Sequence, residues 1–151
     1  MVDIVDKKTR SRMMRAIKSK NTKPEILVRK CLHKKGYRYR LGSKVGKRKP
    51  DIVLRKYKVA VFVHGCFWHQ HVGCRLAYSD RVYSDKWIKK FQSNINRDKQ
   101  VEQDMLSKGW RIAIIWECVT RDKDRFGCEI SKLDHWIREE NRIKWETEYK
   151  K

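Results

Sequence analysis

Residues 64–74 limit the possible folds of this chain more than any other segment. They contain three histidines, two cysteines and two large aromatic side chains, and they directly follow the apolar run 59–63. Such a run is typical of a strand buried on both faces, and the loop after a buried strand often carries functional residues. The sequence therefore predicts a sheet with a functional loop at the end of a central strand.

The cysteines of this loop have the spacing of metal ligands. Cys66, His71 and Cys74 form a Cys-x4-His-x2-Cys set, and Cys118, after the apolar run 110–116, can supply a fourth ligand. Three thiolates and one imidazole leave no open coordination position, which is typical of structural zinc. The alternative is that small buried cysteines lie beside unrelated histidines. Ordinary burial is expected for the remaining candidates, which are Cys31, Cys128, His33 and His135.

Basic residues run along the whole chain. The 39 lysines and arginines outnumber the 18 aspartates and glutamates, which gives a formal net charge of +21. Such a surface suits a polyanion, so nucleic acid is the expected partner. Charge alone does not separate an enzyme from a ribosomal-type or other RNA-coating protein.

The sequence favours a cytoplasmic protein without a membrane partner. No apolar run approaches the ~20 residues that a membrane span needs, and residues 1–6 lack the apolar region of a signal peptide. Five cysteines in such a chain do not indicate a disulfide framework.

Helix and strand patterns alternate along the chain. Residues 1–22 are predicted to form a basic arm ahead of a single domain over 23–151. Within that domain the patterns predict helices over 22–36, 85–107 and around 130–137, and strands over 37–41, 51–54, 57–64 and 110–116. The first helix has a capping box formed by Thr22 and Glu25. This order predicts an α/β fold in which helices flank a mixed central sheet.

The two strands over 51–54 and 57–64 suggest a hairpin that brings Asp51 close to His64. Phosphodiester hydrolysis needs such a pair, because a carboxylate can hold Mg²⁺ at the phosphate while a base activates the attacking water. If zinc uses His71, then His64 and His69 remain, one as general base and the other as a phosphate-binding or acid group. The alternative for Asp51 is turn chemistry after a proline.

Several motifs of the chain resemble the very-short-patch-repair mismatch endonucleases, a branch of the restriction-endonuclease-like superfamily. The resemblance extends from the arm to about residue 120. Its motifs are Asp6-Lys7-x-Thr9-Arg10-Ser11-x-x-Met14-Arg15, Pro50-Asp51, Phe62-Val63-His64-Gly65-Cys66-Phe67-Trp68-His69, Asn94-x-x-Arg97-Asp98 and Trp116-Glu117-Cys118. The superfamily's usual second acidic residue and lysine are absent, with Phe62 and His64 near those places.

The resemblance implies roles around two metal ions. Asp51 and the backbone carbonyl of Val63 would bind Mg²⁺. His64 and His69 would flank the scissile phosphate, and Glu25 would lie near the metal, although its capping role is an alternative. The implied ligands of structural zinc are Cys66, His71, Cys74 and Cys118.

The resemblance also implies DNA contacts. A wedge of Phe67, Trp68 and Trp87 would enter between base pairs beside a mismatch, where unstacking costs least. Met14 of the arm would approach the minor groove. On one side of the second long helix, the residues facing DNA would be Lys90, Asn94 and Arg97. The alternatives are core roles for Trp87 and Met14 and a solvated polar face on the helix, and Asp98 is expected to orient an arginine.

The implied activity is Mg-dependent nicking of one strand on the 5′ side of the thymine in a T:G mismatch left by deamination of 5-methylcytosine. The implied partner is double-stranded DNA with such a mismatch, and other mismatch-repair proteins are candidate partners. A monomer of bacterial or archaeal type, associated with the nucleoid, is expected. Two alternatives stay open: a restriction-type endonuclease on the same fold, and a non-catalytic zinc-containing nucleic-acid-binding protein.

Overall fold

The computed structural model of the protein describes residue 8, residues 21–77 and residues 85–148. Most of the predicted basic arm, including Met14, lies outside the described residues, so the arm and the single domain after it stay predictions. In chain order the elements are α2 (Lys23–Lys34), β1 (Ile52–Leu54), the short 3-10 helix η1 (Arg55–Tyr57), β2 (Val59–His64), α3 (Asp85–Ser107), β3 (Arg111–Trp116), α4 (Glu117–Thr120), α5 (Lys123–Glu139) and β4 (Lys144–Glu146).

The four strands form one mixed sheet in the order β1-β2-β3-β4. β1 runs antiparallel to β2, whereas β2, β3 and β4 are parallel to one another. The mixed sheet flanked by helices is therefore confirmed. Because β2 and β3 pair from Val59 opposite Arg111 to His64 opposite Trp116, their carboxyl ends lie at the same edge of the sheet. The loop after β2 and the helix after β3 consequently start side by side.

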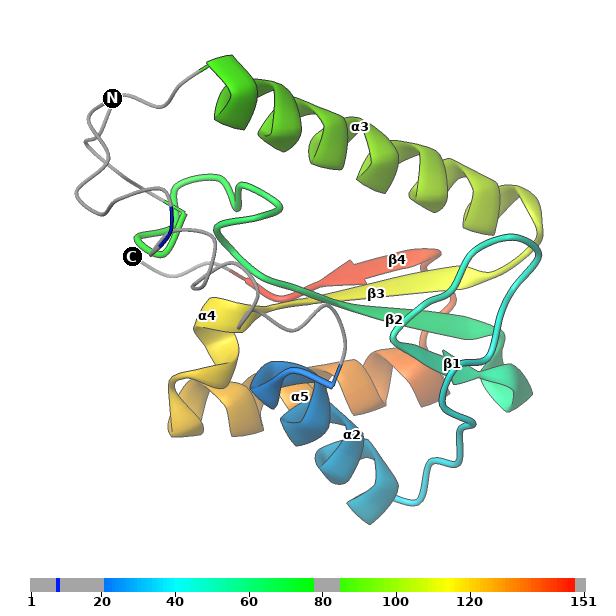
Figure 1. The fold of residues 1–151 in the computed structure, drawn as a ribbon. Helices are drawn as coiled ribbons and strands as arrows, with labels where there is room; N and C mark the ends of the chain where they lie inside the picture. Colours follow the sequence, from blue (N-terminus) through cyan, green and yellow to red (C-terminus); the bar gives the residue numbers. More distant parts are fainter. Residues whose placement is uncertain (1–7, 9–20, 78–84, 149–151) are drawn as a thin grey trace.

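Helices cover both faces of the sheet (Figure 1). α2 and α5 lie against one face, where Leu32 and Leu133 are fully buried with alternate residues of the strands. α3 lies over the other face, where Met105 is fully buried against Ala60 and Ile112. Because successive side chains of a strand point to opposite faces of the sheet, alternate strand residues belong to the two different cores. No helix among the described ranges is long and apolar enough to cross a membrane.

The first predicted strand, over 37–41, is wrong. The alternating tyrosines instead face the helices: the Tyr37 hydroxyl donates to Asp134 Oδ1 at 2.6 Å, and the Tyr39 hydroxyl donates to the Arg29 carbonyl at 3.0 Å. β4, which pairs with β3 at the edge of the sheet, was not predicted, because three residues are too short for a periodic pattern.

The predicted burial of isolated cysteines and histidines is largely wrong. Cys31 is partly buried beside the core, but Cys128, His33 and His135 are exposed. Each of these three residues lies on the solvent-facing side of its helix. Membership of a helix therefore did not show which of its faces is buried.

Candidate active site and metal centre

Asp51 is anchored to β2 by a direct hydrogen bond. The backbone N–H of Val63 donates to Asp51 Oδ2 at 2.7 Å. The β1–β2 ladder ends at Ile52 opposite Val61, so the Asp51 side chain takes the position of a missing ladder partner. In a paired strand residue the N–H and the C=O point to the same edge, and therefore the Val63 carbonyl also faces the side on which Asp51 lies. The hairpin brings Asp51 to the end of β2, as the sequence predicts.

The surroundings of Asp51 disfavour its ionised form in the metal-free protein. Burial raises the pKa of Asp51 from 3.8 to about 6, the Val63 N–H opposes that rise, and the nearby Glu25 carboxylate adds to it. A partly buried carboxyl group beside another carboxylate is an arrangement that a cation would stabilise, because the cation compensates both charges. Asp51 and Glu25 together could hold a divalent ion.

Glu25 both caps a helix and approaches Asp51. Thr22 caps α2, since its side chain accepts from the Glu25 N–H at 3.4 Å. In a capping box the glutamate side chain also accepts from the backbone N–H of the N-cap residue, which is Thr22 here. In this protein the Glu25 carboxylate accepts instead from the N–H of the preceding residue, Asn21, at 2.9 Å. Arg29, one turn further along α2, donates to the same carboxylate oxygen at 3.2 Å. Glu25 is only 4% exposed, so its capping and its position near Asp51 coexist.

The two candidate catalytic histidines lie against each other. The rings of His64 and His69 stack with centroids 4.0 Å apart and an interplanar angle of 3°. His69 Nδ1 lies 2.7 Å from Asp98 Oδ2, within hydrogen-bond distance. Each nitrogen lone pair lies in the plane of its own ring, and one ion cannot lie in the planes of two stacked rings, so these two imidazoles are poorly arranged to chelate one ion. The cluster of His64, His69 and Asp98 is better suited to proton transfer and phosphate binding.

His64 is neutral at physiological pH. Its pKa falls from 6.5 to about 3, first because of burial and second because of the neighbouring His69. Its Nδ1 is buried and has no hydrogen-bond partner within the described part of the chain. A buried polar atom of this kind usually has a functional role or a bound water or ion as its partner.

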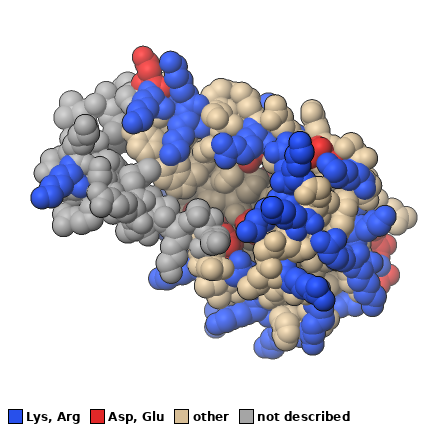
Figure 2. Space-filling model, turned by 45° about the vertical axis from the view of Figure 1, so that its right-hand side comes forward, with Lys and Arg blue, Asp and Glu red and all other residues tan. Residues whose placement is uncertain are grey.

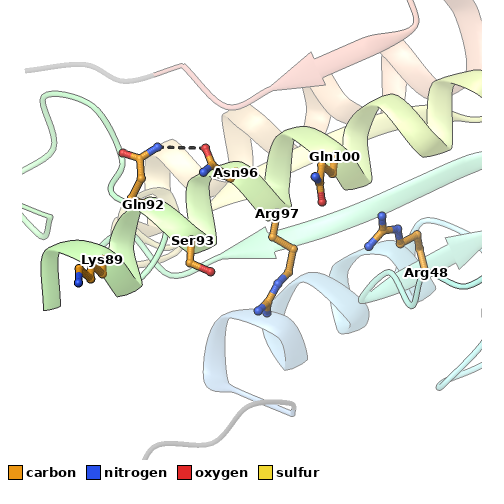
Figure 3. Close-up of a pocket in the computed structure, with 7 residues that line it drawn as sticks. All are labelled: Arg48, Lys89, Gln92, Ser93, Asn96, Arg97 and Gln100. Carbon is orange, nitrogen blue, oxygen red and sulfur yellow. Dashed lines mark hydrogen bonds between the residues drawn. The ribbon is translucent and has the colours of Figure 1, made fainter. Parts of the chain in front are cut away.

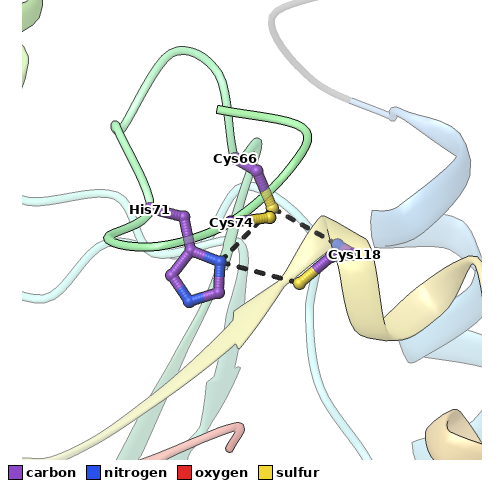
Figure 4. Close-up of side chains that lie close together, drawn as sticks. All are labelled: Cys66, His71, Cys74 and Cys118. Carbon is purple, nitrogen blue, oxygen red and sulfur yellow. Dashed lines mark hydrogen bonds between the residues drawn. The ribbon is translucent and has the colours of Figure 1, made fainter. Parts of the chain in front are cut away.

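The four predicted metal ligands come together at the edge where β2 and β3 end (Figure 4). The ligand atoms of Cys66, His71, Cys74 and Cys118 all lie within 4.8 Å of one another. His71 Nδ1 lies 3.7 Å from Cys66 Sγ and 3.6 Å from Cys118 Sγ. Burial raises the pKa of the Cys66 and Cys118 thiols and lowers that of His71. The four side chains could therefore hold a metal ion that displaces the thiol protons.

Local backbone geometry directs these ligands inward. The His71 N–H donates to the Cys66 carbonyl at 2.9 Å, and the Cys118 N–H donates to Cys66 Sγ at 3.3 Å. Gln70 and Gly73 take positive φ angles of 48° and 74°, which turn the chain sharply on either side of His71. Within this tight loop Cys66 and Cys74 are buried, whereas Phe67 and Trp68 are partly exposed.

Four aromatic rings from the loop and α3 form one cluster. Phe67 lies 5.2 Å from Trp68 and 5.1 Å from Phe91, and Trp68 lies 5.5 Å from Trp87, between ring centroids. Phe91 is only 7% exposed, whereas the other three rings are partly exposed. The predicted wedge of Phe67, Trp68 and Trp87 is thus a preassembled surface group that is supported from beneath by Phe91.

The three predicted DNA-contacting residues of α3 have different surroundings. Lys90 Nζ lies 5.1 Å from the centre of the Trp68 ring. The Asn94 amide donates to the Trp68 carbonyl at 3.0 Å and thereby ties the loop to α3. Arg97 is exposed and lines an open groove (Figure 3). Figure 2 shows a hollow on one face of the molecule with lysines and arginines along its rim.

Sequence reasoning missed two residues of the site. Asp98 was expected to orient an arginine, but it pairs with His69. Arg29 pairs with Glu25, and its positive charge partly opposes the rise in the pKa of Asp51 that burial causes. The i,i+4 spacing of Glu25 and Arg29 could have indicated their pair, whereas nothing in the sequence links Asp98 to a loop 29 residues earlier.

The carboxylates of Asp51 and Glu25 and the imidazoles of His64 and His69 gather near the end of β2, an arrangement suited to metal-dependent hydrolysis of phosphodiesters. The fold is similar to the solved structure of the homing endonuclease I-Bth0305I catalytic domain, with a TM-score of 0.51, 22% identity, and coverage of 78% of this chain and 96% of that chain. At this identity the likeness concerns the fold.

Sequence comparison assigns the family. A sequence model described as DNA mismatch endonuclease Vsr matches residues 2–75. The type II nicking enzyme V.NmeAIP of Neisseria meningitidis serogroup A is 43% identical over 123 residues, covering 82% of this chain and 87% of the relative. The DNA mismatch endonuclease Vsr of Escherichia coli K12 is 34% identical over 139 residues, covering 91% and 88%. The chain belongs to the Vsr family of DNA endonucleases.

Proposed function

We propose that this endonuclease uses Mg²⁺ to nick one strand of DNA on the 5′ side of the thymine in a T:G mismatch. The observation that carries the proposal is the hydrogen bond between Asp51 and the Val63 N–H, which fixes a partly buried carboxylate at the end of the strand that carries His64. The mismatch specificity is supported by the name of the Escherichia coli relative, a DNA mismatch endonuclease. Membership of an endonuclease family removes the non-catalytic alternative.

Asp51 and the Val63 carbonyl would hold the ion, with Glu25 near it. Mg²⁺ at this position would supply charge neutralisation at the scissile phosphate and activation of the attacking water. Glu25 is held in place by Arg29 and by the Asn21 N–H, so its carboxylate is oriented before any ion binds. The three groups fit Mg²⁺ because all three are hard oxygen donors.

His69 is the better candidate for the general base. With its Nδ1 proton donated to Asp98, its Nε2 is left to accept a proton, and the carboxylate would stabilise the resulting imidazolium. His64 has a pKa of about 3 and is a weak base, so we assign it the orientation of the phosphate or the support of His69 by stacking. These roles separate two histidines that the sequence alone treats as equivalent.

A structural zinc ion would be held by Cys66, His71, Cys74 and Cys118. Tetrahedral zinc with bonds of about 2.3 Å to sulfur and about 2.0–2.1 Å to nitrogen would have its nitrogen about 3.5–3.6 Å from each sulfur. The separations of 3.7 and 3.6 Å from His71 Nδ1 to the Cys66 and Cys118 sulfurs agree with this value. Zinc would join the loop after β2 to the end of β3 and so stiffen the loop that presents Phe67 and Trp68.

The aromatic cluster would select mismatched DNA. Unstacking costs a few kcal/mol per base step and least at a mismatched step, so a stiff wedge of Phe67, Trp68 and Trp87 would enter there preferentially. Lys90, Asn94 and Arg97 would contact the DNA beside the wedge, and Met14 would approach it from the arm. We propose that the protein acts as a monomer in the bacterial cytoplasm at the nucleoid, with other mismatch-repair proteins as candidate partners.

A nicking assay on paired duplexes tests this function. Duplexes with a T:G pair or a matched C:G pair at the same position are incubated with the full chain and Mg²⁺. Nicking of only the T strand in the mismatched duplex is expected. Cutting of both strands in matched DNA would support the remaining alternative, a restriction-type endonuclease on this fold.

A further inference from the structure

An open groove of about 510 Å³ runs along α3 (Figure 3). Arg48, from the loop before β1, faces it from the side of the sheet. All its lining side chains are basic or neutral polar. Those on α3 are Lys89, Gln92, Ser93, Asn96, Arg97 and Gln100.

The groove contains no acidic lining residue because the acidic residues in the second half of α3 are occupied elsewhere. Asp98 contacts His69, and Glu102 pairs with Lys144 at 2.9 Å. Asp104 pairs with Arg48 at 3.1 Å and with Lys108 at 3.0 Å, so its charge is compensated twice. The seven lining residues therefore present cations, amides and a hydroxyl, and the carboxylate beside them, Asp104, is already paired with two cations. Such a surface is suited to phosphate oxygens.

Arg48 is held in place at the far end of the groove. Its Nε donates to Asp104, and this bond does not engage its two terminal nitrogens. The loop that carries it is closed by a bridge between Val45 and Arg48. A pre-positioned guanidinium loses little side-chain freedom when it binds a phosphate.

The length of the groove sets the length of nucleic acid that fits it. Lys89 and Gln100 are eleven residues apart in one helix, which corresponds to about 17 Å at 1.5 Å per residue. B-DNA rises about 3.4 Å per base pair along the duplex axis, so roughly five base pairs span this distance where that axis runs along α3. The groove begins near Lys89, two residues after Trp87 of the aromatic cluster.

We infer that this groove binds the phosphate backbone of one DNA flank, over about five nucleotides beyond the aromatic cluster. The inference rests on the proposed function, because it takes the DNA to be centred on that cluster. The groove makes affinity depend on the length of one flank and not of the other. Asn96 and Gln100 would contribute through phosphate contacts, without any role in cleavage.

The test compares a groove variant with a charge-matched control. The double variant Asn96→Glu, Gln100→Glu adds two negative charges in the groove at exposed helical positions. The control Lys34→Glu changes the net charge by the same amount on α2, which covers the opposite face of the sheet (Figure 1). Fluorescence anisotropy measures binding of each full-length protein to mismatched duplexes in which one flank at a time is shortened. Thermal unfolding confirms that both variants fold.

With long flanks, the groove variant should bind at least about tenfold more weakly than the control, and its affinity should fall less steeply with salt. When one particular flank is shorter than about five base pairs, the groove variant and the control should bind equally. The inference would be overturned if the groove variant and the control bound equally at every flank length. It would also be overturned if the affinity of the wild type did not depend on the length of either flank. Mismatch-dependent nicking by the wild type would remain intact in that event, so the groove and the proposed function fail separately.

Discussion

Asp98 Oδ2 lies 2.7 Å from His69 Nδ1, although the two residues are 29 positions apart in the chain. A carboxylate in this position fixes the tautomer and the orientation of an imidazole. It also connects α3, which carries part of the candidate DNA surface, to the loop that carries the candidate base.

Asp98→Asn should lower the rate of nicking without weakening the binding of DNA. Loss of an orienting partner of this kind typically costs about 10- to 100-fold in activity. Single-turnover nicking and anisotropy binding, measured on the same mismatched duplex, separate the two effects. Asp85→Asn, in the first turn of the same helix, is the control and should retain full activity. A nicking rate for Asp98→Asn equal to that of the control would remove Asp98 from the site.

Asp51→Asn should stabilise the Mg-free protein at neutral pH. Burial raises the pKa of Asp51 from 3.8 to about 6 in the folded protein, so the carboxyl group prefers to stay protonated there. The stability that the bound proton provides is complete below about pH 4 and is lost as the pH rises through 6. At pH 7 the variant should therefore be more stable than the wild type by about 3 kcal/mol.

Chemical denaturation from pH 4 to pH 8 in Mg-free buffer measures this difference, which should vanish at the acid end. Added Mg²⁺ should stabilise the wild type and leave the variant unchanged. A wild type that is more stable than the variant at pH 7 without Mg²⁺ would contradict this prediction, because it would show that ionisation of Asp51 does not lower the free energy of unfolding.

Cys118→Ser should remove bound metal and loosen the loop after β2. The purified wild type should contain about one zinc per chain by elemental analysis, because four ligands converge on one point. Cys128→Ser, at an exposed position on α5, is the matched control and should retain its zinc. Hydrogen exchange in residues 65–77 should accelerate in the first variant only. Equal metal content in both variants would exclude Cys118 as a ligand.

Trp68→Ala should reduce the preference for mismatched over matched DNA. Stacking of a base on an aromatic side chain contributes about 1–3 kcal/mol, which corresponds to a loss of roughly 5- to 150-fold in affinity for the mismatched duplex. Phe91→Leu, beneath the same cluster, should lower the stability of the protein more than it changes this preference, since Phe91 is 7% exposed. The ratio of the two dissociation constants is the measurement. An unchanged ratio for Trp68→Ala would mean that the ring does not enter the duplex.

Local patterns predicted the elements that are long or capped. The bounds of α3 agree with its predicted range, because Gly109, with a φ of 79°, ends a long helical pattern clearly. The tyrosines of 37–41 misled the prediction, because alternation describes only which side chains are buried and does not show whether the backbone has a partner strand. Their hydroxyl groups bond to a helix residue and a helix carbonyl instead.

The candidate site was predictable where its residues share one short segment. Cys66, His71 and Cys74 lie within one loop, and Cys118 could be added because it follows a buried run. Asp98 was assigned the wrong partner, since its position on α3 says nothing about which loop folds back over that helix. Both roles of Glu25 were named from the sequence, but only the capping followed from a local motif. Its position near the metal came from the family resemblance, because Asp51 is distant in sequence.

The most direct test of the account is the nicking rate of Asp51→Asn on a T:G duplex, titrated with Mg²⁺ under single-turnover conditions with the protein in excess. We predict that this variant binds the duplex at least as well as the wild type. Its nicking rate should be at least about a thousandfold lower than the wild-type rate at every Mg²⁺ concentration. A variant that nicks within tenfold of the wild-type rate would contradict the central claim that the Asp51 carboxylate holds the catalytic ion.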